Sequence, residues 1–173
     1  MNRSKPLRVG VIFGGRSSEH EVSLSSAHNV MDALDKAGYT VIPIGVSPHG
    51  HWLAGGDPMK QLSTAASTTD TGRSSGQGRA SLPSRPASDS WALLPQTENA
   101  APMPAIDVIF PVLHGPYGED GTLQGLLEMA NLPYVGCGVL SSAMAMDKVV
   151  AKRLFATENI PQTRYHVVMR RRW

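Results

Sequence analysis

The segment at residues 114–125, HGPYGEDGTLQG, holds a histidine, several glycines and two acidic residues close together. An apolar run at 106–113 precedes it, and a helix-like stretch at 123–130 follows. Parallel sheets bind ligands beyond the carboxyl ends of their strands and near helix N-termini, where glycine lets the backbone come close to the ligand. The pattern therefore favours a ligand site over an ordinary glycine-rich connection. We expect Glu119 and Asp120 to organise this loop rather than to transfer protons.

The start of the chain has the same arrangement. Residues 7–13, LRVGVIF, form a short run rich in β-branched residues, which is typical of a buried strand. Apolar residues then recur at helical spacing between 22 and 37, and residues 40–46 predict the next strand. With the run at 106–112, these segments predict a parallel α/β sheet covered by helices.

The loop after the first strand, GGRSSEHE, narrows the choice of site. Ser17 or Ser18 is expected to cap the following helix, with Glu21 completing a capping box. The glycine pair lacks the three-glycine dinucleotide fingerprint, and no lone acidic residue ends the second strand to hold a ribose. A nicotinamide or flavin dehydrogenase is therefore disfavoured, and the P-loop pattern is absent as well.

Composition indicates a soluble, cytoplasmic protein. The chain has 173 residues, is 41% hydrophobic and contains one cysteine, Cys137. We expect no signal peptide, and no run is near the ~20 apolar residues of a membrane span. The last 27 residues carry seven Lys and Arg against two Asp and Glu, but no aromatic–basic interleaving or zinc-type spacing accompanies them. We therefore expect neither a nucleic acid nor a membrane as partner.

Residues 63–90 differ sharply in composition from their surroundings. Of these 28 residues, 21 are Ser, Thr, Ala, Gly or Pro. Such a stretch cannot bury enough apolar area to offset its ordering entropy. We expect a disordered or loop insertion around 63–104, with Trp52 and Trp91 anchoring its ends.

The C-terminal part predicts further short elements. A very short strand is expected at 134–135, followed by helices at 139–146 and 147–158. Residues 163–169 alternate like the first strand of a new sheet, which would be exposed and prone to aggregation without partners.

Three blocks resemble the N-terminal part of bacterial D-alanine–D-alanine ligase, in the order of that family. They are GGRSSEHEVSLSS at 14–26, HGPYGEDGTLQG at 114–125 and LPYVGCGVLSSAMAMDKVVAK at 132–152. The resemblance implies an ATP-grasp enzyme of peptidoglycan synthesis. In that family ATP phosphorylates the carboxylate of the first D-alanine, and the amine of the second attacks the acyl phosphate.

The resemblance also implies roles for individual residues. Glu19 matches the glutamate that holds the ammonium of the first D-alanine, although a carboxylate here could simply favour a helix N-terminus. His114 matches the histidine beside that substrate's carboxylate. Ser141 and Ser142 lie in the substrate-proximal turn, where helix capping is the stronger interpretation. Lys148 matches a lysine that reaches the phosphates of ATP, or is otherwise a solvated helix lysine.

By resemblance, residues 1–136 form a parallel three-layer, Rossmann-like, pre-ATP-grasp domain, and 137–173 begin a truncated ATP-grasp domain. Ligases of this type are about twice as long, so we expect the chain alone to be inactive. The complete enzyme would use ATP with Mg²⁺ or Mn²⁺, whose ligands are absent here, and would be a homodimer. A non-catalytic α/β module that binds small amino acids is the alternative, and another ATP-grasp ligase is a weaker one.

Overall fold

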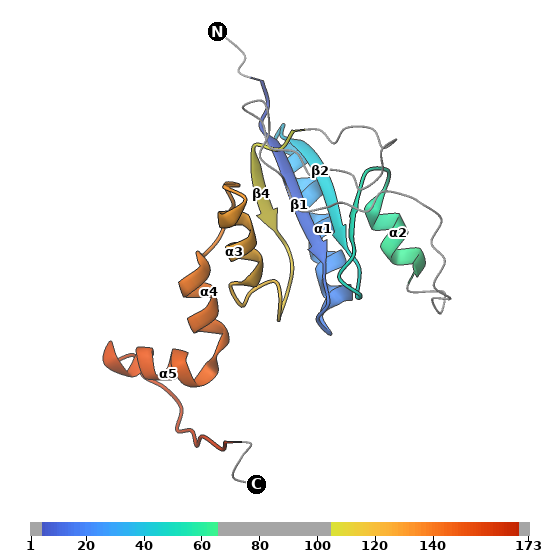
Figure 1. The fold of residues 1–173 in the computed structure, drawn as a ribbon. Coiled ribbons are helices and arrows are strands. Elements are labelled where there is room, and N and C mark those ends of the chain that lie inside the picture. The colour runs from blue at the N-terminus through green and yellow to red at the C-terminus, as the bar shows by residue number, and fades with distance from the viewer. Residues whose placement is uncertain (1–4, 66–104, 170–173) are drawn as a thin grey trace.

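A computed structural model describes residues 5–65 and 105–169 as a mixed α/β structure (Figure 1). The described elements, in chain order, are β1 (Arg8–Gly14), α1 (His20–Lys36), β2 (Thr40–Val46), β3 (Trp52–Ala54), α2 (Pro58–Ala65), β4 (Val108–Pro111), α3 (Thr122–Met129), α4 (Val139–Met146) and α5 (Lys148–Thr157). The α/β class and the three predicted parallel strands are confirmed.

The strands form one sheet in the order β3-β2-β1-β4. Strand β1 pairs in parallel with β2 and with β4, so residues far apart in the chain become neighbours at the sheet's carboxyl edge. Strand β3 adds an antiparallel edge that the sequence did not predict. The expected short strand at 134–135 is a single parallel bridge between Ile109 and Tyr134.

Helices cover both faces of the sheet, which gives three layers. On one face, Leu24 and Ala27 of α1 and Leu62 of α2 pack against Val11 and Phe13 of β1. On the other face, α3 packs its buried leucines against the sheet. Successive side chains of β1 point alternately into the two cores, which explains why this strand is apolar along most of its length.

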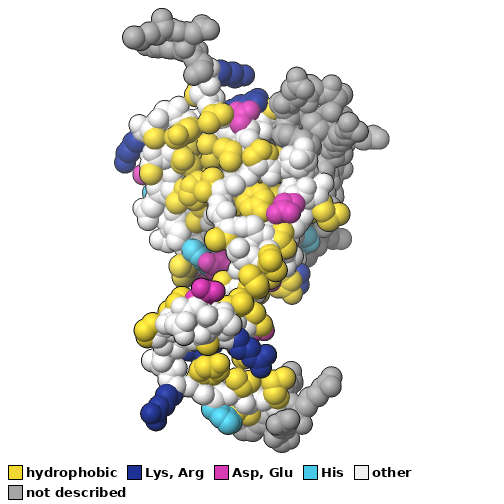
Figure 2. All heavy atoms as spheres, turned by 90° about the vertical axis from the view of Figure 1, so that its left-hand side faces the viewer, with side chains coloured by type: hydrophobic (Ala, Val, Ile, Leu, Met, Phe, Trp, Pro, Cys, Tyr) yellow, Lys and Arg dark blue, Asp and Glu magenta, His cyan; other side chains and the backbone are white. Residues whose placement is uncertain are grey.

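Helices α4 and α5 extend away from the sheet (Figure 1). Helix α4 packs against α3, and α5 packs against α4. On the side of the molecule that faces left in Figure 1, hydrophobic side chains are exposed from the sheet and its helices down to α4 and α5 (Figure 2). Leu140 and Phe155 are among the exposed residues.

The expected strand at 163–169 is wrong, because this segment has no regular secondary structure. Its alternating side chains are mostly exposed, and no neighbouring strand pairs with it within the described ranges. A strand depends on such a partner for its backbone hydrogen bonds. Residues 163–169 therefore do not form the exposed strand from which aggregation was expected.

The expected insertion is wrong at its first residues, since 63–65 complete α2. Here Ser63 and Thr64 donate their hydroxyl hydrogens to carbonyls one helical turn earlier, so small polar residues are accommodated in the helix. Residues 66–104, with Trp91, lie outside the described part.

No helix in the described part is long and apolar enough to cross a membrane.

Candidate functional site

The candidate site lies where β1 and β4 end side by side. Their following loops carry Glu19 and His114, which are 95 positions apart in the sequence. The Ser17 hydroxyl joins the loops by donating to the His114 carbonyl oxygen at 2.7 Å. It also accepts a hydrogen bond from the Glu19 amide at 3.2 Å.

The Glu19 carboxylate lies directly against the backbone of the other loop. A Cβ atom placed on Gly115 would lie 2.8 Å from Glu19 Oε2 and would displace that carboxylate, and the φ of +68° at Gly115 is a conformation that favours glycine. Glu19 itself is exposed. The half-buried His114 imidazole has Nε2 3.3 Å from the Ser26 hydroxyl of α1. A carboxylate and an imidazole are thus presented from adjoining loops.

The two acidic residues of the second loop hold its backbone. Glu119 accepts from the Gly115 amide at 2.7 Å, while Asp120 accepts from the amides of Tyr117 and Thr122 at 2.9 and 3.0 Å. Burial acts to raise the pKa of Asp120, but these backbone donors outweigh it and hold that pKa below its ordinary value. Both carboxylates therefore organise the loop, as the sequence predicts.

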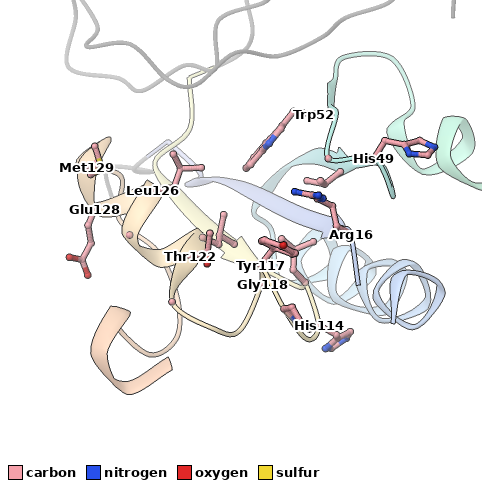
Figure 3. A pocket seen from close by; sticks show the side chains of 18 residues that line it. Arg16, His49, Trp52, His114, Tyr117, Gly118, Thr122, Leu126, Glu128 and Met129 are labelled. Atoms are coloured by element: carbon pink, nitrogen blue, oxygen red, sulfur yellow. The ribbon is translucent and has the colours of Figure 1, made fainter. Parts of the chain in front are cut away.

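A cavity of about 810 Å³ adjoins the loops, between α3 and the end of β2 (Figure 3). Apolar side chains, including Trp52 and Leu126, form much of its wall, and His114 lies on its border. Arg16 and Tyr117 also line the cavity, and the Arg16 guanidinium carbon is 4.7 Å from the centre of the Tyr117 ring. Tyr117 has φ +68°, a conformation that side chains rarely adopt and that often occurs at functional sites.

The expected capping box is wrong. Helix α1 begins after Glu19, and no side chain caps it. The Ser17 hydroxyl is directed to the other loop instead, because His114 offers it a carbonyl acceptor at 2.7 Å.

Two buried residues that sequence analysis missed hold this region. Ser23 Oγ accepts from the Gly14 amide at 2.8 Å and donates to the Val112 carbonyl at 2.5 Å, joining the ends of β1 and β4. His20 Nδ1 lies 2.8 Å from the Gly15 carbonyl oxygen. The signal that could have found them was the helical spacing, which places both on the same inward face of α1 as Ala27.

The remaining predicted site residues lie on α4 and α5. Ser141 is exposed, whereas Ser142 is buried and donates to the Cys137 carbonyl at 3.4 Å. Lys148 is exposed at the first position of α5. The structure brings the loops of Glu19 and His114 into contact, but it places Lys148 on α5, a helix that packs against α4.

Comparison with known proteins gives a consistent result. The chain is 47% identical over 165 residues to the D-alanine–D-alanine ligase of Heliobacterium modesticaldum, covering 95% of this chain and 43% of that protein. It is 48% identical over 166 residues to the ligase of Geobacillus thermodenitrificans, covering 96% and 44%. The chain thus spans under half the length of these relatives.

Solved structures agree. The VanG D-Ala:D-Ser ligase of Enterococcus faecalis matches with a TM-score of 0.70 and 35% identity, over 90% of this chain and 43% of that one. The D-alanine–D-alanine ligase of Coxiella burnetii matches with a TM-score of 0.69 and 31% identity, over 91% and 43%. Residues 8–137 match the family described as the D-ala D-ala ligase N-terminus. The chain therefore belongs to the D-alanine–D-alanine ligase family.

Proposed function

We propose that this chain supplies the binding site for the first D-alanine in a D-alanine–D-alanine ligase. The whole protein would join two D-alanines for peptidoglycan synthesis at the expense of ATP. The observation that supports this most strongly is the contact of Glu19 with the loop of His114, in a chain of the ligase family.

The chemistry of the two side chains suits opposite ends of an amino acid. The exposed Glu19 carboxylate can accept hydrogen bonds from the ammonium of D-alanine, which offers three charged donors. The His114 imidazole can donate to the substrate carboxylate. Held in this way, a carboxylate oxygen of the first D-alanine would attack the γ-phosphorus of ATP and release ADP. The amine of the second D-alanine would then attack the acyl carbon, lose a proton and release phosphate.

Lys148 would contribute charge to the ATP phosphates, and Ser141 and Ser142 would lie near the substrate. The Asp147 carboxylate already accepts from the Val149 and Val150 amides, so Lys148 would act through its side chain rather than through helix amides.

For Mg²⁺ or Mn²⁺ the described residues do not fit. Within 5–65 and 105–169, no group of three His, Cys, Asp or Glu residues is placed to hold a metal ion. No step of this proposal is therefore assigned to a metal bound by these residues.

A cytoplasmic location follows from the use of ATP, and the family resemblance supports a homodimer as the state of the whole protein.

A chimeric ligase tests the proposal. Residues 1–173 would replace the matching part of the Geobacillus thermodenitrificans ligase, and D-alanyl-D-alanine and phosphate would be measured. We expect turnover that depends on D-alanine. Glu19→Gln should raise the KM for the first D-alanine by about tenfold or more, the scale of one hydrogen bond to a charged group. Glu21→Gln, at an exposed acidic residue two positions further along the chain, is the matched control.

Two outcomes would contradict the proposal. A folded chimera that binds D-alanine without turnover would favour the non-catalytic amino-acid-binding module. An active chimera in which Glu19→Gln and Glu21→Gln have equal KM values would show that Glu19 does not hold the substrate.

A further inference from the structure

The Ser17 hydroxyl occupies a bridging place between the two loops of the candidate site. Its single proton goes to the His114 carbonyl at 2.7 Å, and its oxygen accepts from the Glu19 amide at 3.2 Å. The first partner is 97 residues away, so this hydroxyl does more than shape its own turn. A Cβ atom on Gly115 would lie 3.2 Å from Ser17 Cβ, so the side chain also packs against the second loop.

The supports beneath Ser17 are of a different kind. Ser23 joins the strand ends at Gly14 and Val112, below the loops and in the core. His20 holds the Gly15 carbonyl, at the beginning of the first loop. Between Gly15 and α1, Ser17 therefore joins the first loop to the second by a hydrogen bond, and Arg16 joins them by its contact with the Tyr117 ring.

We propose that Ser17 is a positioning residue for the first D-alanine: its hydroxyl sets the spacing between the Glu19 carboxylate and the His114 imidazole. This rests on the proposed function, in which those two groups hold opposite ends of one small substrate. Ser17 need not touch the substrate. It acts by fixing the backbone of both residues that do, so that the loops are ordered before the substrate binds.

The role predicts a selective kinetic effect. Without the bridge, each encounter with D-alanine must order two loops, which raises the KM for the first D-alanine. Lys148 lies on α5, which packs against α4, so the KM for ATP should change little. General loss of fold would instead lower the active fraction and leave both KM values unchanged.

The test uses the chimera that carries residues 1–173. Ser17→Ala should raise the KM for the first D-alanine by about tenfold and change the KM for ATP by less than about twofold. Ser17→Thr, which keeps the hydroxyl, should restore most of the loss. Ser18→Ala, at the exposed neighbour, is the matched control. In the 173-residue chain itself, amide exchange at Glu19 should be faster in Ser17→Ala than in Ser18→Ala.

Each result is decisive. An active chimera with the same D-alanine KM in Ser17→Ala and Ser18→Ala would overturn the positioning role and leave the proposed function standing. An inactive unmutated chimera would overturn the proposed function and the positioning role with it. If Ser17→Ala does not fold, the isosteric pair Ser17→Thr and Ser17→Val replaces it, and equal D-alanine KM values in that pair would refute the role.

Discussion

Replacing Ser23 by alanine should destabilise the fold more than its small change in volume suggests. Ser23 is completely buried on α1, and its hydroxyl bonds the Gly14 amide at 2.8 Å and the Val112 carbonyl at 2.5 Å. Alanine would leave both backbone groups buried without this partner. The substitution therefore removes the cross-link between the carboxyl ends of β1 and β4.

The magnitude follows from those two groups. A buried donor or acceptor without a partner costs about 1–3 kcal/mol, so the pair costs about 2–6 kcal/mol. The higher helix propensity of alanine returns about 0.5 kcal/mol. We expect a net loss of about 3 kcal/mol in the free energy of unfolding. With an m-value of about 1.5–2 kcal/mol/M, the urea midpoint should fall by about 1.5–2 M.

Urea unfolding followed by far-UV circular dichroism measures this loss. Ser25→Ala is the matched control, because Ser25 is exposed on the same helix and should give a midpoint equal to or slightly above that of the unmutated chain. Exchange of the Gly14 amide should become faster only in the Ser23 variant. Equal urea midpoints for the two variants would refute the reasoning, since the two buried bonds would then contribute nothing net.

Two further changes test the frame of the site. Gly14→Ala should cost about 3 kcal/mol or more by urea unfolding, because the residue has φ +91° and its Cβ would clash with the Val46 carbonyl oxygen; Gly38→Ala, at φ +85° with open space around it, should cost only about 1 kcal/mol, and equal costs would contradict the clash. The Arg8 guanidinium, hydrogen-bonded to Asp107, lowers the pKa of that carboxyl to about 2. The stabilisation that this pair gives the fold should therefore be present above about pH 4 and be lost as the pH falls toward 2. We expect a change of about 1 kcal/mol in the free energy of unfolding, since the pair is partly exposed. Asp107→Asn should remove this part of the acid dependence, and an unchanged pH profile would count against it.

Apolar patterning predicted the parts of the fold that bury the most surface. Residues 7–13 and 40–46 are mostly apolar because parallel strands are covered on both faces, and both segments form strands. Strand β3 has three residues and none is fully buried, so it left no comparable signal. The segment 163–169 shows the opposite error, since its alternation had no partner strand to support it.

Site residues could be predicted from the sequence only where the side chain is itself charged or titratable. Glu19 and His114 stood out as charged or titratable groups beside glycines, and the structure places their loops in contact. Ser17 and Ser23 gave no such signal, because a serine in a loop or a helix is more often a cap or a solvated residue. Their roles depend on carbonyl acceptors about 90 or more residues away, which local spacing cannot reveal.

The two serines are expected to serve different purposes: Ser23 stabilises the fold, whereas Ser17 orders the loops that would bind the substrate. Ser23 is fully buried, so water cannot reach the strand ends to replace its hydrogen bonds. The loss of these bonds is therefore expected to lower the free energy of unfolding. Ser17 lies half-buried at the loop tips, where water can satisfy the Glu19 amide and the His114 carbonyl when the hydroxyl is removed. Its loss should therefore cost little stability and appear mainly as loop disorder that the substrate must overcome. A fold of this kind can vary its loop tips for affinity while the buried bridge beneath them keeps the two strand ends together.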